Sequence, residues 1–191
     1  MCIRDSSYDG QPWLDEIRSL HVTDVDEAGS WWALDFATTL RSVAPQPLVF
    51  GSPTTHGRAG AGYGGLFWRG PRSFMNGEIL AAGGLHGPAV MGQPAPWLAY
   101  VGRHDGTDGP TAAASPSVSH STMLFVDRPD SFRFPTKWFV RQEPYGCASF
   151  AVTFDQEHTL LPGESFSLRH RIVVADGALT LPQIDAVANR P

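Results

Sequence analysis

Cysteine, charge and long apolar runs are all scarce in this 191-residue sequence, and each shortage excludes a class of protein. The two cysteines, Cys2 and Cys147, cannot build a disulfide framework or a cysteine-based zinc site. Cys147 is expected to be a small apolar strand residue. Charged residues make up only 17% of the chain, which argues against disorder maintained by charge repulsion. No apolar run approaches the roughly 20 residues that span a bilayer, so we expect a soluble protein without a membrane partner.

Basic residues are also too few for a surface that binds polyanions. The formal net charge is −5 and the sequence pI is near 5.7. Nucleic acids are bound through a basic surface, so no nucleic-acid partner is expected. Arg58, Arg69 and Arg72 lie close together in the sequence, which still allows a small anionic or polyhydroxylated ligand.

The start of the chain does not look native. Its letters MCIRDS resemble the translated adapter leader found on assembled environmental sequences. We therefore expect residues 1–7 to be a non-native leader and residues 8–191 to form one domain. Such a leader leaves the cellular compartment open, with the cytoplasm favoured.

Glycine and proline, by contrast, are abundant. The 20 glycines and 16 prolines fall without a fixed period between short apolar runs, which is typical of strands joined by turns. Alternation over residues 31–40 predicts a half-buried strand that pairs with residues 20–26 in a hairpin. Its apolar face is expected to contain Trp32, Leu34, Phe36 and Leu40. Asp35 is expected on the opposite, polar face.

Further strands are predicted along the chain, and together they define the fold class. They lie within residues 47–51, 96–106, 120–130, 137–154 and 165–174. Pro162-Gly163 suits the centre of a type II turn, and residues 107–119 are expected to form a surface loop. Only residues 179–190 have the pattern of a helix, with Thr180 as its N-cap. The sequence therefore predicts an all-β antiparallel sandwich with a short C-terminal helix.

The glycine-rich stretch GRAGAGYGGLFWRGPRSF, residues 57–74, contains the spacing G-x-G-x-x-G. A dinucleotide site needs a helix after these glycines and an acidic residue about 20 positions later, and both are missing here. Two interpretations stay open. The stretch is either a plain glycine-rich turn or a strand that passes beneath a ligand. In the second case Tyr63 and Trp68 would offer flat faces to a sugar ring, and Arg69 a planar pair of donors.

Three blocks of sequence carry a resemblance to a known family. The blocks cover residues 50–74, 91–106 and 138–177, and contain YGGLFWR, GRHDG and PGESFSLRHRIVVADG. They resemble the bacterial soluble proteins labelled "methane oxygenase PmoA", from about residue 30 to 180. The resemblance implies a large β-sandwich of the galactose-mutarotase (supersandwich) type. Because family members carry a further histidine-rich N-terminal region, it also implies that this chain is incomplete at the N-terminus.

The family label implies a metal-dependent oxygenase, which the residues do not support. Particulate methane oxidation requires a membrane-embedded metal protein, and neither a spanning segment nor an H-x-H, H-x-x-x-H or cysteine-based metal spacing occurs here. No metal or other cofactor is therefore expected. A metal held by His56, His86 and His104 is the alternative that the oxygenase reading would need.

Likeness to mutarotases implies an acid and a base on either side of a sugar ring. The candidate catalytic residues are His104, Asp105 and Glu143, each just after a predicted strand. A polar turn at His104 and Asp105, or an ion pair between Glu143 and an arginine, would explain the same residues. His170 lies on the apolar side of its strand and is expected to be a core histidine.

The candidate ligand-binding residues share a position near the glycines or the GRHDG segment. They are His56, Arg58, Tyr63, Trp68, Arg69 and Arg103. The favoured function is a carbohydrate-related protein that binds or acts on a sugar ring by acid–base chemistry in a sandwich cleft. The alternatives are a carbohydrate-binding module without catalysis, and the oxygenase of the family label.

Overall fold

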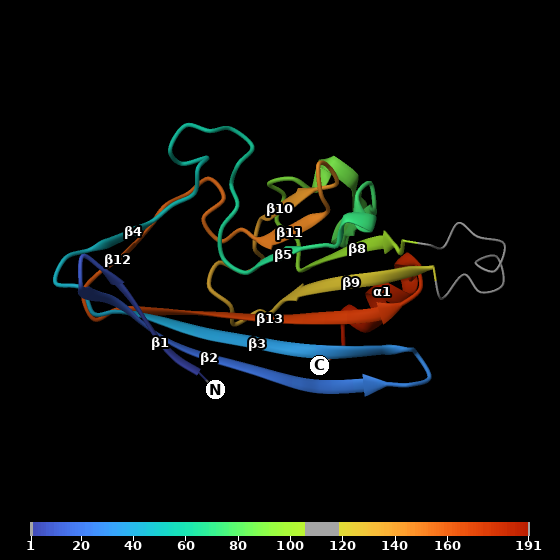
Figure 1. The fold of residues 1–191 in the computed structure, drawn as a ribbon, viewed down its shortest axis with the longest axis horizontal. Coiled ribbons are helices and arrows are strands. Elements are labelled where there is room, and N and C mark those ends of the chain that lie inside the picture. Colours follow the sequence, from blue (N-terminus) through green and yellow to red (C-terminus); the bar gives the residue numbers. More distant parts are fainter. Residues whose placement is uncertain (1, 106–118, 191) are drawn as a thin grey trace.

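The computed structural model describes residues 2–105 and 119–190, and a single large antiparallel sheet runs along its length (Figure 1). The strand order in this sheet is β1-β2-β3-β13-β9-β8-β6-β7. Its strands are, in chain order, β1 (Cys2–Tyr8), β2 (Gln11–Asp26), β3 (Trp31–Ser42), β6 (Glu78–Ala81), β7 (Leu85–His86), β8 (Trp97–Arg103), β9 (His120–Asp127) and β13 (Ser165–Asp176). The predicted loop at residues 107–119 lies outside the described residues, apart from Ser119.

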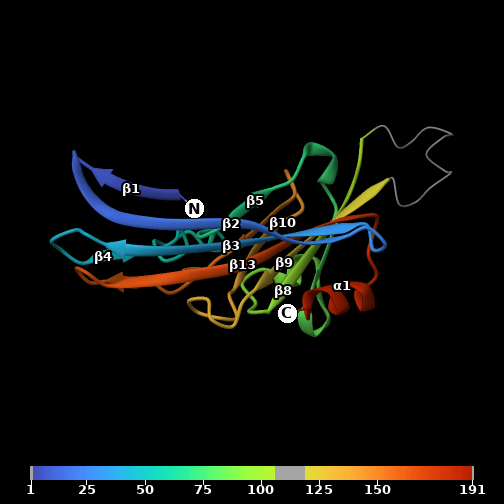
Figure 2. The same cartoon turned by 90° about the horizontal axis from the view of Figure 1, so that it is seen from below.

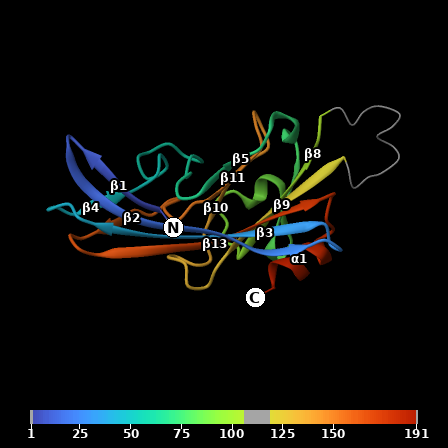
Figure 3. The ribbon, with the colours of Figure 1, turned by 60° about the horizontal axis from the view of Figure 1, so that its bottom comes forward.

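Two smaller sheets and a few helical turns complete the described structure. The strands of the three-stranded sheet, in the order β10-β11-β5, are β5 (Phe67–Arg69), β10 (Trp138–Arg141) and β11 (Cys147–Phe150). β4 (Leu48–Phe50) pairs with β12 (His158–Leu160) at the end of the molecule remote from the helix α1 (Leu181–Ala188), as Figures 1 and 3 both show. The 3₁₀ turns are η1 (Arg72–Phe74), η2 (Ala82–Gly84) and η3 (Gly87–Val90).

The large sheet is covered on both faces, but by different partners. On one face Leu98, Tyr100 and Phe125 pack against Trp138 and Phe150 of the three-stranded sheet. The other face packs against Ile184, Val187 and Ala188 of α1. Figure 2 shows β5 above the sheet and α1 below it. This arrangement confirms the prediction of an all-β antiparallel sandwich with a short C-terminal helix.

The predicted hairpin is confirmed, but the buried face of its second strand is partly wrong. β2 and β3 pair antiparallel around the turn after Asp26. Trp32, which was expected inside, is 40% exposed, whereas Trp31 is 6% and Ala33 0% exposed. The reason is that α1 covers the face of β3 that carries Trp31 and Ala33. Further along the strand, Phe36 is buried on the opposite face, as predicted.

β13, like β3, is covered on one face along only part of its length. Its sequence alternates Ser165, Ser167, Arg169 and Arg171 with apolar residues, which predicts one polar, exposed face. Arg169 is exposed, as this predicts, but Arg171 is only 6% exposed. Its Nε and Nη2 donate to the two carboxylate oxygens of Asp35, directly opposite on β3, at 2.7 and 3.0 Å. This two-pronged hydrogen bond holds the pKa of Asp35 below its usual value. The predicted polar face of β13 therefore exists only in its first half.

Several local predictions are confirmed. Gly163 has the positive φ of 81° that the second central position of a type II turn requires. The backbone N–H of Thr180 donates to the side chain of Gln183 at 2.8 Å, as part of a capping box at the start of α1. His170 is a buried core residue, 1% exposed. Residues 2–7 of the expected leader belong to β1, which pairs with β2, and the leader stays a prediction.

Within the described ranges, no helix has the length and apolar character needed to cross a membrane.

Candidate functional site

A broad hollow opens beside the turn between β10 and β11, and we take it as the candidate site. Its volume is about 510 Å³, the greatest of five hollows compared among the described residues. Pockets of about 300–1,000 Å³ are the usual size for small-molecule ligands. Its lining consists of Asn76, Ile79, Pro88, Met91, Val140, Arg141, Gln142 and Glu143.

Two turns of the chain form the polar wall of this hollow, and they are tied to each other. The backbone N–H of Asn76 donates to the carbonyl of Gln142 at 3.1 Å. In return, the side-chain amide of Gln142 donates to the carbonyl of Gly77 at 2.7 Å. Asn76 has a φ of +61°, a left-handed conformation that asparagine tolerates better than most residues. These bonds fix where the polar groups of both turns stand.

A buried tyrosine holds the turn that contains Asn76 in place. The hydroxyl of Tyr100 donates to the carbonyl of Phe74 at 2.7 Å, and burial raises the pKa of Tyr100 to about 12. The hydroxyl therefore stays protonated and keeps donating across the ordinary pH range. Ile79, from the adjacent strand β6, is 1% exposed and forms part of the apolar floor.

Arg141 and Glu143 bring opposite charges to the rim of the hollow. Arg141 is the last residue of β10 and is half-buried, and its guanidinium carbon lies 5.3 Å from the ring centre of Phe139. Glu143 is exposed in the turn that follows. An apolar floor beneath a rim of two charged and two amide side chains suits a ligand with one apolar face and several hydroxyl groups.

Of the three predicted catalytic residues, only Glu143 lines this hollow. His104 follows β8, and its Nε2 lies 2.9 Å from the hydroxyl of Ser121 on β9. Its ring meets the edge of Phe74 at 5.7 Å. Asp105 is exposed in the turn after it. The structure therefore does not bring His104 and Asp105 into one pocket with Glu143.

The glycine-rich stretch supplies a strand, as one of the two interpretations requires, but its aromatic residues are used for packing. Trp68 faces inward and contacts Tyr100 and Phe125, with ring centres 5.3 and 5.4 Å away. Tyr63 stands edge-on to Phe139 at 5.4 Å. Trp68 therefore packs against the core, but it is half-buried and also lines a separate hollow of about 160 Å³, so its role as a ligand-facing residue stays a prediction.

Arg69 and Arg103, also predicted to bind a ligand, lie on other strands and outside the lining of the hollow. The guanidinium of Arg69 lies over the ring of Tyr145, 4.2 Å from its centre. Arg103 ends β8 and pairs with His120 of β9. The predicted ligand-binding residues are thus distributed over separate parts of the molecule.

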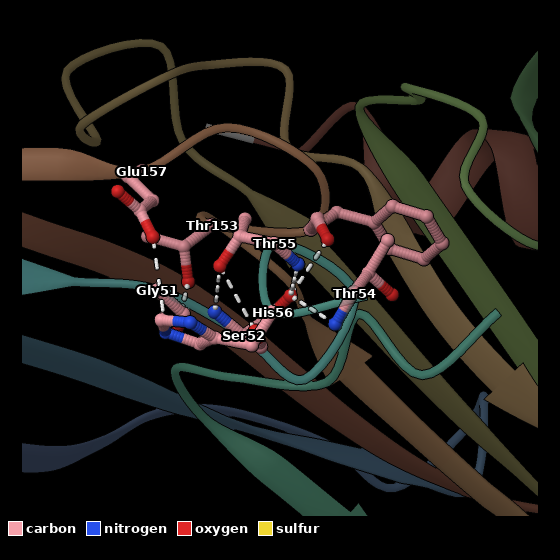
Figure 4. Close-up of polar contacts among 8 residues, drawn as sticks. Gly51, Ser52, Thr54, Thr55, His56, Thr153 and Glu157 are labelled. Atoms are coloured by element: carbon pink, nitrogen blue, oxygen red, sulfur yellow. Dashed lines mark hydrogen bonds and ion pairs between the residues drawn. The ribbon is translucent and has the colours of Figure 1, made fainter. Parts of the chain in front are cut away.

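His56 and Arg58 lie in the turn after β4, which is hydrogen-bonded to the segment that leads into β12. Figure 4 draws the part of this turn that contains His56. The hydroxyl of Ser52 accepts from the backbone N–H of Thr54 at 3.1 Å, and the N–H of Arg58 donates to the carbonyl of Pro53 at 2.9 Å. His56 Nε2 lies 3.7 Å from Glu157 Oε1, with 73% and 43% of the two side chains exposed. A polar contact between side chains this exposed contributes little to stability.

One glycine of the stretch is required by the backbone. Gly65 has a φ of +70°, and a Cβ there would collide with the carbonyl oxygen of Phe150. We expect Gly65→Ala to lower the free energy of unfolding by about 2 kcal/mol, because both the left-handed φ and the collision are unfavourable. Chemical denaturation would measure this loss.

Gly60→Ala is the matched control for that prediction. Gly60 has a φ of +66° with no atom within 4 Å of the added Cβ, so it isolates the backbone contribution. An equal loss in both variants would contradict the role of the Phe150 carbonyl.

The environment of His158 depends on contacts that its local sequence does not indicate. It begins β12 and is half-buried, with its ring centre 4.5 Å from that of Phe132 and 5.4 Å from that of Phe166. Burial lowers the pKa of His158, and the nearby charge of Arg133 lowers it further. Asn76 and Gln142 were missed as lining residues, although the Asn76-Gly77 pair is a turn signal in the sequence.

Two further features of the described residues concern the buried cysteine and the possible ligands of a metal. Cys147 is 0% exposed in β11, and burial raises the pKa of its thiol, as suits the expected small strand residue. Among residues 2–105 and 119–190, no three histidine, cysteine, aspartate or glutamate side chains gather as a metal site would require.

Comparison with known proteins assigns the chain to a family but not to an activity. The family model DUF6807, described as a family of unknown function, matches residues 4–189. No curated protein and no solved structure matches the chain. The resemblance to PmoA-like proteins and to mutarotases stays a prediction.

Proposed function

We propose that this chain, which belongs to the DUF6807 family, binds a sugar ring in the hollow beside Glu143. The observation that carries the proposal is the lining of this hollow, a polar rim over an apolar floor. A pyranose has apolar C–H faces and a rim of hydroxyl groups, so it matches both parts at once.

The polar groups of the rim have complementary roles toward hydroxyl groups. The Arg141 guanidinium can only donate hydrogen bonds, and the Glu143 carboxylate can only accept them. The amide nitrogen of Gln142 is engaged with Gly77, which leaves its oxygen as an acceptor. A hydroxyl can donate and accept, so neighbouring hydroxyls of one sugar can satisfy Arg141 and Glu143 together.

The lining favours binding over catalysis. Acid–base chemistry on a sugar ring requires two groups that exchange protons within hydrogen-bond reach of the reacting atoms. The lining residues include one carboxylate, Glu143, and neither a histidine nor a second carboxylate. We therefore favour the non-catalytic carbohydrate-binding protein over the sugar-converting enzyme.

Calorimetry with D-glucose, D-galactose and lactose tests the proposal. We expect Arg141→Ala and Glu143→Ala each to weaken binding about 10- to 100-fold, because each removes a charged hydrogen bond worth about 1.5–3 kcal/mol. Arg41→Ala is the matched control, since Arg41 is exposed on β3 and does not line the hollow.

Two outcomes would contradict the proposal. One is the absence of binding for all three sugars. The other is a sugar whose affinity is unchanged by both Arg141→Ala and Glu143→Ala. Accelerated interconversion of the sugar anomers, followed by NMR, would instead favour the enzyme.

A further inference from the structure

A second, smaller hollow lies where β3 and β13 meet the β4–β12 pair. Its volume is about 220 Å³, and it shares no lining residue with the hollow described as the candidate site. Its walls are mostly apolar, and their large apolar side chains are Leu40, Phe50, Phe132, Phe166 and Leu168. The ring centre of Phe166 lies 5.4 Å from that of Phe50 and 4.9 Å from that of Phe132. The hollow therefore has walls that suit an apolar or aromatic guest.

The two polar side chains of this lining, Thr153 and His158, differ in how they are paired. The hydroxyl of Thr153 donates to the carbonyl of Gly51 at 3.2 Å (Figure 4). His158 Nε2, by contrast, is shielded from water and has no hydrogen-bond partner among residues 2–105 and 119–190. A buried nitrogen without a hydrogen bond is costly, and native proteins usually pair such atoms. A molecule bound in the hollow would supply a partner.

His158 is suited to a hydroxyl group in particular. Burial lowers its pKa, and the nearby charge of Arg133 lowers it further, so the ring is neutral at pH 7 and above. A neutral imidazole has one nitrogen that donates a hydrogen bond and one that accepts. A hydroxyl group can do both, so it pairs with Nε2 in either tautomer.

Hydrogen bonds hold the walls of this hollow in place. The guanidinium of Arg133 donates to the carbonyls of Val152 and Glu157, at 2.8 Å each. The backbone N–H of Phe132 donates to the carbonyl of Ser167 on β13, also at 2.8 Å. The first two bonds fix the segment that leads into β12, and the third fixes Phe132 against the large sheet. The hollow is thus preformed, as small-molecule sites usually are.

We propose that this hollow binds a compact aromatic molecule that carries one hydroxyl group, hydrogen-bonded to His158 Nε2. An apolar cavity of about 150 Å³ can hold a benzene ring, so a hollow of about 220 Å³ has room for a ring with a small substituent. The phenylalanine walls offer the edge-on and offset contacts that aromatic rings prefer. Gly64 and Gly65 line the same hollow. The glycine-rich stretch would then lie against a ligand, which is the second of its two interpretations.

Two other occupants match the hollow less well. A buried water usually makes about three hydrogen bonds, whereas the side chains here offer His158 Nε2 and a Thr153 hydroxyl whose hydrogen is already engaged. A sugar would place several hydroxyl groups against phenylalanine and leucine side chains, where they lose their hydrogen bonds to water. One hydroxyl on an apolar body matches both parts of the lining.

Binding of p-cresol and toluene, followed by NMR titration, tests the proposal because the two probes differ only in the hydroxyl group. We expect p-cresol to bind the native chain. His158→Phe should weaken p-cresol binding about tenfold, since it removes one buried hydrogen bond, and should change toluene binding by about twofold at most. His86→Phe is the matched control, because His86 is exposed on β7 and outside the hollow, and it should bind both probes as the native chain does.

A second measurement needs no change at His158. The side-chain nitrogen resonances of a histidine report its tautomer and hydrogen bonding, so p-cresol should shift the Nε2 resonance of His158 and toluene should leave it nearly unchanged. Glu143→Ala should bind p-cresol as the native chain does, which separates this site from the hollow proposed to bind sugars.

Three results would overturn the proposal. They are p-cresol that does not bind up to the limit of its solubility, an affinity for p-cresol that is the same in the native chain and in His158→Phe, and bound p-cresol that leaves the Nε2 resonance of His158 unmoved.

Discussion

Replacing Asp127 with alanine is expected to lower the free energy of unfolding by about 3–5 kcal/mol, as the loss of one partner of a buried polar pair does. Asp127 is 2% exposed. One carboxylate oxygen lies 3.0 Å from His170 Nδ1, and the other accepts the backbone N–H of Thr136 at 2.8 Å. The variant would leave both groups buried without these partners, and a buried polar group without a hydrogen bond is costly.

Denaturation in urea, followed by tryptophan fluorescence, measures this loss. Asp127→Asn is the control variant, because its amide oxygen can still accept one of the two hydrogen bonds, and we expect it to lose less. A change below about 1 kcal/mol in Asp127→Ala would show that the surroundings of His170 relax or admit water, against our expectation.

Trp138→Ala is expected to have an effect of similar size, about 3–5 kcal/mol, for a different reason. Trp138 is 0% exposed between the large and the three-stranded sheet, and its ring centre lies 4.6 Å from that of Phe150. Its indole N–H donates to the carbonyl of Ala95 at 2.9 Å. Truncation removes apolar contacts, leaves a cavity and frees the Ala95 carbonyl.

The matched control is the same substitution on the surface. Trp32→Ala, at a position 40% exposed, should lose about 1 kcal/mol or less. Thermal unfolding of both variants gives the comparison. Equal losses would mean that the packing between the two sheets at Trp138 contributes no more than a surface contact does.

The elements that the sequence predicts well are those whose signals are local. The turn at Gly163 depends on one residue that tolerates positive φ, and the start of α1 depends on a cap three residues before Gln183. The strands β8, β9 and β13 are regular alternations or short apolar runs between turn residues. In each case the neighbouring residues contain the information.

The parts that were missed depend on contacts between distant segments. Trp31 rather than Trp32 is buried because α1, some 150 residues later in the chain, covers that face. Trp68 faces inward because β5 joins the edge of β11, which was not visible in the spacing of the glycines. Period-two alternation identifies two faces of a strand but does not say which one is covered.

The candidate site was predicted only in part, because some of its residues are brought together by contacts between distant segments. Glu143 was predicted from its place after a strand, and it lines the hollow. Asn76 joins it through hydrogen bonds between turns more than 60 residues apart, which no local pattern reveals. His104 and Asp105 have the same local signal as Glu143, yet they lie outside this hollow.

The two-sided covering of β13 has a consequence for how the chain avoids wrong structures. The first half of β13 is packed on one face only. The second half also buries Val173 and Ala175 on the face that α1 covers. Sliding this strand by a single position would send side chains from both interiors into water at the same time. We therefore expect slipped alignments of β13 to be rare among folding errors, so that misfolding begins instead at margins where a strand meets only one neighbour.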